Sequence, residues 1–113
     1  MTNNSAQLSE DAYLAIRTIC HQRAEAYPAP HAYETLANLK MLAAALGTSI
    51  EIIGQGLTNS LETHNVTDAP GTNPATGVTI ANHHLAQATS LARQLADLLD
   101  SAQQAITNQG YKD

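Results

Sequence analysis

The first pattern along the chain is a stripe of apolar residues at three- and four-residue spacing, which predicts an amphipathic helix. Its apolar positions are Ala12, Tyr13, Ile16, Ile19, Cys20, Ala24 and Tyr27. Ser9 precedes two acidic residues and fits an N-cap, because acidic side chains are favourable in the first turn of a helix. Pro28 and Pro30 end the pattern, since proline disrupts a helix interior. We predict a helix over 9–27, preceded by a disordered N-terminus at 1–8.

The second pattern is a heptad of apolar residues, which is typical of a coiled coil. It comprises Leu36, Leu39, Ala43, Leu46, Ile50, Ile53, Leu57 and Leu61. Gly47 interrupts the heptad, and the segment from Thr48 to Glu51 fits a capping box that would open a fresh helix. The heptad nevertheless keeps its phase across Gly47, which favours one continuous helix over 31–63. A break at Gly47, with two shorter helices, stays open as an alternative.

A third apolar pattern follows a segment rich in turn-forming residues. Pro70 and Gly71 lie at the expected chain reversal, and Asn73 fits an N-cap with Pro74 at the first helical position. The apolar seam comprises Val78, Ala81, Leu85, Ala88, Ala92, Leu95, Leu99, Ala102 and Ile106. We predict a helix over 74–109, antiparallel to the preceding helix because the connection is short, and a C-terminal tail at 110–113.

Together the three patterns predict an all-α protein, with a short N-terminal helix plus a long antiparallel helical hairpin in a single domain over 9–109. The composition agrees, because the chain lacks Trp and Phe and so has few of the aromatic residues that a β-sandwich or barrel typically uses. A helix of about 30 residues is roughly 45 Å long, so a coiled-coil-like hairpin leaves apolar surface uncovered along its length. We therefore expect dimerisation into a helical bundle.

Two glycines mark part of the predicted interaction surface. Gly47 and Gly54 share a stripe of the second helix, where the missing side chains permit close approach of another helix. Either the N-terminal helix fills this groove, through Ala12, Ile16 and Ile19, or a partner does. We expect the N-terminal helix to pack there in the isolated chain and to be easily displaced. The residues predicted to contribute to the dimer interface are Met41, Ile52, Leu91 and Leu98.

Charge and cysteine content narrow the class of protein. The chain has 10 acidic against 5 basic residues and a net charge of −5, so it lacks the basic footprint that nucleic-acid binding requires. Its single cysteine excludes an internal disulfide and favours a reducing compartment. The polar N-terminus and the short apolar run at 41–46 predict neither a signal peptide nor a membrane span. We expect a cytoplasmic protein that binds neither nucleic acid nor membrane.

Candidate chemistry along the chain is sparse. His83 and His84 are adjacent in a predicted helix and point about 100° apart, so they cannot chelate a metal as a pair. We expect His84 to be half-buried. Cys20 lies on an apolar stripe, where a buried thiol is inert. Asp97 and Asp100 fit solvated surface charges on one polar face. We predict no catalytic, metal-binding or cofactor-binding residue and no cofactor.

One architectural resemblance exists. In length, low charge and a pair of antiparallel helices rich in Ala, Gln, Asn and Thr, the chain resembles the small secreted helical-hairpin proteins of the WXG type. It departs from them at the turn, where it has Asp68-Ala69-Pro70-Gly71 in place of the Trp-x-Gly motif. The resemblance covers architecture only and implies a small secreted hairpin as one alternative function.

Regular heptads without a catalytic constellation predict a non-enzymatic helical module for protein–protein interaction. Such a module would act as an adaptor or inhibitor, of the kind that a phage or mobile element encodes, and would form a homodimer as well as bind a protein partner. The competing class is a metal-binding or small-ligand-binding helical bundle. That class requires histidines from different helices to converge.

Overall fold

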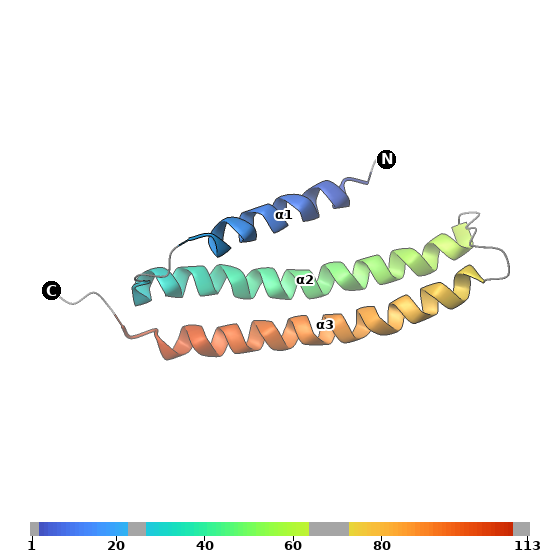
Figure 1. The fold of residues 1–113 in the computed structure, drawn as a ribbon. Helices are drawn as coiled ribbons and strands as arrows, with labels where there is room; N and C mark the ends of the chain where they lie inside the picture. Colours follow the sequence, from blue (N-terminus) through green and yellow to red (C-terminus); the bar gives the residue numbers. More distant parts are fainter. Residues whose placement is uncertain (1–2, 23–26, 64–72, 110–113) are drawn as a thin grey trace.

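The computed structural model describes residues 3–22, 27–63 and 73–109. These residues form α1 (Ser5–Cys20), α2 (Ala29–Thr63) and α3 (Pro74–Ala105). The long helices α2 and α3 run antiparallel and pack along their length, whereas α1 is a separate rod beside them (Figure 1). The molecule measures 69 × 25 × 24 Å. The predicted all-α class, with a short first helix and a long antiparallel hairpin, is confirmed.

The ends of α1 differ from the prediction. Asn3 accepts a hydrogen bond from the Ser5 amide at 2.8 Å, and the helix begins at Ser5. Ser9 therefore lies inside the helix, where its hydroxyl donates to Ala6 O, and it is not the N-cap. The prediction of disorder is wrong for 5–8, while residues 1–2 lie outside the described part. Three-residue turns, such as Gln22 N–H donating to Ile19 O at 3.0 Å, close α1 after Cys20, seven residues before the predicted end at Tyr27.

Helix α2 runs without interruption through Gly47. The hydroxyls of Thr48 and Ser49 donate back to Ala44 O and Leu46 O, as hydroxyl side chains do within a helix. These residues therefore do not form the alternative capping box. The helix begins at Ala29, because Pro28 O already accepts from the Ala32 amide at 2.9 Å.

Helix α3 begins as predicted and ends earlier. The Asn73 side chain accepts from the Ala75 amide at 2.9 Å, with Pro74 in the first turn. At the other end, Ile106 N–H donates to Gln103 O over a three-residue turn, so the helix ends at Ala105 and not at residue 109. The turn at Pro70-Gly71 and the tail at 110–113 lie outside the described residues.

The most deeply buried positions between α2 and α3 are mostly small residues. The buried hydrophobic residues in the described part of the chain are Ala43, Ala92 and Ala96. Gly47 and Gly54 are buried on the same line of α2. A Cβ atom on Gly47 would lie 3.5 Å from Thr89 O and 3.6 Å from the Ala92 Cβ. Helix α3 therefore occupies the glycine groove, and its backbone comes close to α2 there.

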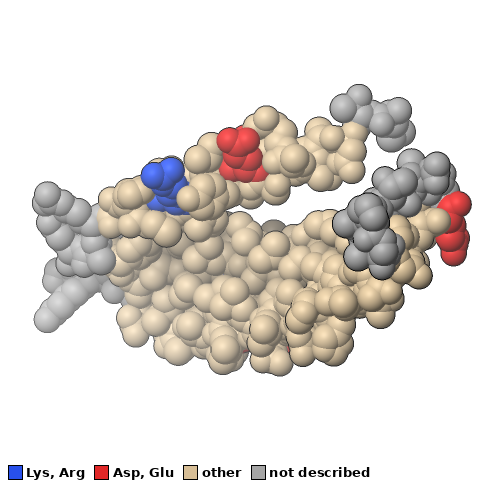
Figure 2. Space-filling view, turned by 45° about the vertical axis from the view of Figure 1, so that its right-hand side comes forward, with Lys and Arg blue, Asp and Glu red and all other residues tan. Residues whose placement is uncertain are grey.

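The expected packing of the N-terminal helix in the glycine groove is wrong, because α3 already fills that groove. No Cα atom of α1 lies within 8 Å of a Cα atom of α2 or α3 among the described residues. Ile19 is exposed and Ile16 is half-buried. Figure 2 shows open space between the N-terminal half of α1 and the hairpin.

Substitution of Ile16 by Ala is expected to lower the free energy of unfolding by less than about 0.5 kcal/mol, because within the described residues α1 does not pack against α2 or α3. A core isoleucine would lose about 2–5 kcal/mol. Thermal denaturation followed by circular dichroism measures the difference. A loss of stability in the core range would show that α1 is docked in solution.

Candidate interaction face

The glycine line determines which way the large side chains of α2 point. Because successive residues in a helix are about 100° apart, the larger apolar residues form a stripe roughly 90° around from Gly47 and Gly54. These residues are Leu42, Leu46, Ile53 and Leu57, and all of them are exposed. Leu46 is 46% exposed and Ile53 is 53% exposed, although the heptad placed both in the seam with the third helix. That part of the seam prediction is wrong.

Helix α3 contributes a matching stripe. Leu91, Leu95 and Leu98 lie roughly 100° around from the buried Ala92 and Ala96. The helices are antiparallel and the stripes are offset in the same rotational sense, so both stripes lie on one side of the hairpin. We define the apolar face as these two stripes together: Leu42, Leu46, Ile53, Leu57, Leu91, Leu95 and Leu98.

Charged side chains lie away from this face. The hairpin surface in view in Figure 2 carries no Lys, Arg, Asp or Glu except at one end. The charges gather in cross-helix pairs on the other side, where Arg93 pairs with Glu51 and Lys40 pairs with Asp100. All four side chains are partly solvated, so each pair contributes at most about 1 kcal/mol to stability.

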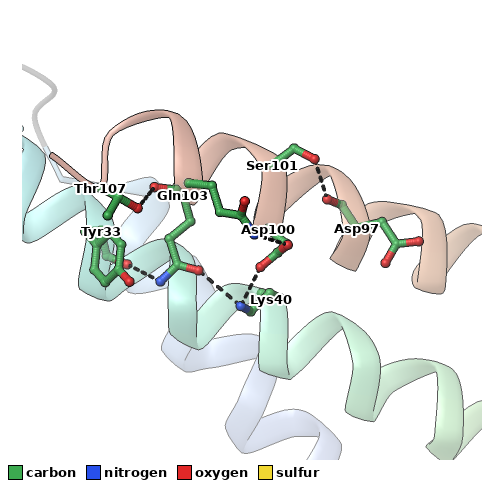
Figure 3. A network of polar contacts seen from close by, with 8 residues as sticks. Tyr33, Lys40, Asp97, Asp100, Ser101, Gln103 and Thr107 are labelled. Carbon is green, nitrogen blue, oxygen red and sulfur yellow. Dashed lines mark hydrogen bonds and ion pairs between the residues drawn. The ribbon is translucent and has the colours of Figure 1, made fainter.

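Polar residues join the two helices at the end of the hairpin where α2 begins (Figure 3). Lys40 Nζ donates to Asp100 Oδ1 at 2.8 Å and to Gln103 Oε1 at 3.1 Å. The Gln103 amide in turn donates to Tyr33 O at 3.4 Å. Gln103 is only 6% exposed, so its side chain needs these partners. This polar cluster specifies the register of α2 against α3.

Near the other end of the hairpin, Asn82 Nδ2 donates to Thr58 Oγ1 at 3.0 Å. A shallow groove of about 610 Å³ opens beside this bond and is lined by residues that include Gly54, Glu51 and Arg93. The groove is on the charged side of the hairpin. Four of its polar lining residues already bond across the two helices, Arg93 to Glu51 and Asn82 to Thr58.

The described residues provide no metal-binding cluster of three or more His, Cys, Asp or Glu side chains. The rings of His83 and His84 meet edge to face, with centroids 5.8 Å apart, and both residues are exposed. His84 is therefore not half-buried as expected. Cys20 is exposed as well, because α1 does not pack its stripe against the hairpin, so the expectation of a buried thiol is wrong.

The residues predicted for the interaction surface fall in three different places. Leu91 and Leu98 belong to the apolar face, at 63% and 69% exposure. Gly47 and Gly54 are buried against α3, and Gly54 lies in the lining of the shallow groove on the charged side. Ile16 and Ile19 lie on α1, apart from the hairpin. Met41 and Ile52 are exposed on α2 outside the apolar face, since each lies more than about 100° from the centre of its stripe.

The heptads placed Leu46, Ile53, Leu57 and Leu95 in the seams, so these residues and Leu42 were not predicted as surface residues. One signal could have identified them. Asn82, Thr89 and Gln103 are polar and recur at heptad spacing, and that line forms the true seam with α2. A polar line within an otherwise apolar helix indicates where hydrogen bonds are made.

One helix within the described ranges is long and apolar enough to cross a membrane, by length and composition alone. It is the segment Ala29–Glu62, with a mean hydropathy of 1.4 in its most apolar window and 11% of that window buried. The sequence predicted no membrane span because its uninterrupted apolar runs are short, whereas this helix is long enough and apolar enough on average.

Comparison of the chain with known protein families, with curated proteins and with solved structures finds no match.

Proposed function

We propose that this protein is a non-enzymatic helical module for protein–protein interaction, and that the apolar face of its hairpin is the binding surface. One observation carries the proposal: seven Leu and Ile side chains lie exposed on a single side of two long helices. Contiguous exposed apolar surface of this kind is typical of interaction sites. An adaptor or inhibitor needs only such a surface, and the described residues hold no group of three or more His, Cys, Asp or Glu that could bind a metal ion.

A cytoplasmic location, away from the membrane, belongs to the same proposal. Helix α3 packs along α2, so a membrane-spanning α2 would carry α3 with it into the bilayer. Helix α3 bears Arg93, Asp97 and Asp100, and charged residues are costly in the hydrocarbon region. The polar seam and the charged side of the hairpin therefore support an aqueous setting.

Photo-crosslinking tests the proposed binding surface. A benzophenone amino acid placed at Leu98 is expected to give a discrete protein adduct, because this side chain is the most exposed of the apolar face. The same probe at the adjacent Asp97, which lies on the charged side, is the matched control and should give little adduct. The experiment is done in cells that express the full chain. Absence of a discrete adduct at Leu98, or equal adducts at both positions, would refute the proposal.

A further inference from the structure

The hairpin lacks a core of large side chains. Within the described ranges no large side chain is fully buried, and the buried hydrophobic residues are all alanines. A compact monomer of 12.0 kDa has an accessible surface of about 6,000 Å², whereas this chain has 8878 Å². The excess of roughly 2,900 Å² is spread over the whole elongated chain, α1 included, and the seven side chains of the apolar face, which are 36–69% exposed, contribute part of it. Each partner contributes about 800 Å² to a typical stable interface, so the chain has enough uncovered surface for one. Some large apolar residues, such as Leu36, Leu85 and Leu99, are half-buried in the hairpin, while the seven residues of the apolar face are exposed.

The features of this face restrict what can cover it. It carries no charge, so it offers no electrostatic basis for recognising a charged partner (Figure 2). Its occupant must be a long, uncharged, leucine-rich helical surface. It must also be present whenever the chain folds, because the leucines have no other burial. A second copy of this chain meets both conditions.

We propose that the apolar face is covered by the same face of a second copy, related by a two-fold axis. This inference rests on the proposed function, because it names the partner that the interaction surface takes. Two hairpins stacked in this way form a four-helix core, in which Leu46, Ile53, Leu91, Leu95 and their symmetry mates are buried. The charged sides of both hairpins then face water, as they do in many four-helix bundles.

Light scattering of the purified full chain at micromolar concentration measures its molar mass and therefore its oligomeric state. The expected mass is twice the 12.0 kDa of the chain. Ile53→Asp is expected to halve that mass, because residue 53 lies on the apolar face. Ile52→Asp is the matched control: the residue type is the same, the position is adjacent, the exposure is 62% against 53%, and the side chain lies outside the face. It should leave the dimer intact.

Leu98→Asp is a second disrupting variant and is expected to halve the mass as well. This variant keeps the test valid if the Ile53 variant misfolds, because the Leu98 side chain is 69% exposed and contributes little to packing within one chain. A wild-type mass equal to one chain would overturn the proposal. In that case a flotation assay with phosphatidylcholine vesicles would show whether the apolar face binds lipid, and a negative result would leave α1 as the element that closes over the face. Equal effects of Ile52→Asp and Ile53→Asp would also overturn the proposal. Crosslinking at Leu98 to a different protein would then leave the proposed function standing without the dimer.

Discussion

Replacing Gly54 by Leu is expected to lower the free energy of unfolding by about 1–3 kcal/mol, the range typical of overpacking a closely packed site. A Cβ atom at this position would lie 2.7 Å from Asn82 Oδ1 and 3.7 Å from Leu85 Cδ1. Asn82 would have to move, which breaks its hydrogen bond to Thr58, and the rest of the leucine side chain would push α3 away from α2. Urea denaturation followed by circular dichroism measures the loss.

Gly56→Leu is the matched control for this experiment. Gly56 lies on the same helix two residues away, and a Cβ atom there meets nothing within 4 Å. Leucine has a higher helix propensity than glycine, so this variant should be more stable by up to about 1 kcal/mol. The two substitutions are therefore expected to have opposite signs. Destabilisation by both would indicate that glycine matters for the helix itself and that α3 does not approach at Gly54.

Replacing Gln103 by Ala is expected to destabilise the hairpin by about 1–3 kcal/mol, the cost of leaving buried polar groups without a partner. The change removes the acceptor at 3.1 Å from Lys40 Nζ and the donor to Tyr33 O, and it leaves a gap at a position that is 6% exposed. Thermal denaturation by circular dichroism, with the free energy compared at one temperature, measures the effect.

The adjacent Gln104 supplies the control for Gln103. Gln104 is exposed and donates to Asp100 Oδ2 at 2.9 Å from within the same helix. Gln104→Ala should therefore change stability by less than about 0.5 kcal/mol. If the two substitutions lowered the free energy of unfolding equally, the stability of this end of the hairpin would not depend on the cross-helix bonds of Gln103.

Local signals in the sequence predicted the parts of the fold that depend on neighbouring residues. Asn73 and Pro74 predicted the start of α3 because capping involves side chains and amides only two or three residues apart. The heptads predicted two long helices for the same reason. At Gly47 the unbroken heptad correctly outweighed the capping signal.

The rotation of the helices depends on contacts between distant residues, and periodicity alone does not determine it. Helix α2 has apolar residues at heptad spacing along two neighbouring lines, one through Ala43 and Ile50 and another through Leu46 and Ile53. Both lines have the same period, so the period cannot show which one meets α3. Gly47 and Gly54 lie beside the first line, and close approach of α3 to these glycines selects it.

The prediction that α1 packs in the glycine groove was wrong for a related reason. Its apolar stripe predicted a helix and a buried side, but a stripe identifies no particular partner. The glycine groove that it was expected to fill has the right shape for any helix. Helix α3 carries Thr89 opposite Gly47, and the Thr89 hydroxyl donates to Gly47 O at 3.4 Å. That bond helps to hold α3, and not α1, against this part of α2.

The polar contacts between α2 and α3 also differ in how much chain each one encloses. The bond between Asn82 and Thr58 spans 24 residues, whereas the bond between Lys40 and Gln103 spans 63. Because the entropy of closing a loop grows with the logarithm of its length, forming the second contact first would cost about 1 kcal/mol more. The two helices should therefore pair first near the connection between α2 and α3, and pairing should then proceed toward the end where α2 begins. The Gln103 cluster would form late, after the glycine contacts have already aligned the two helices.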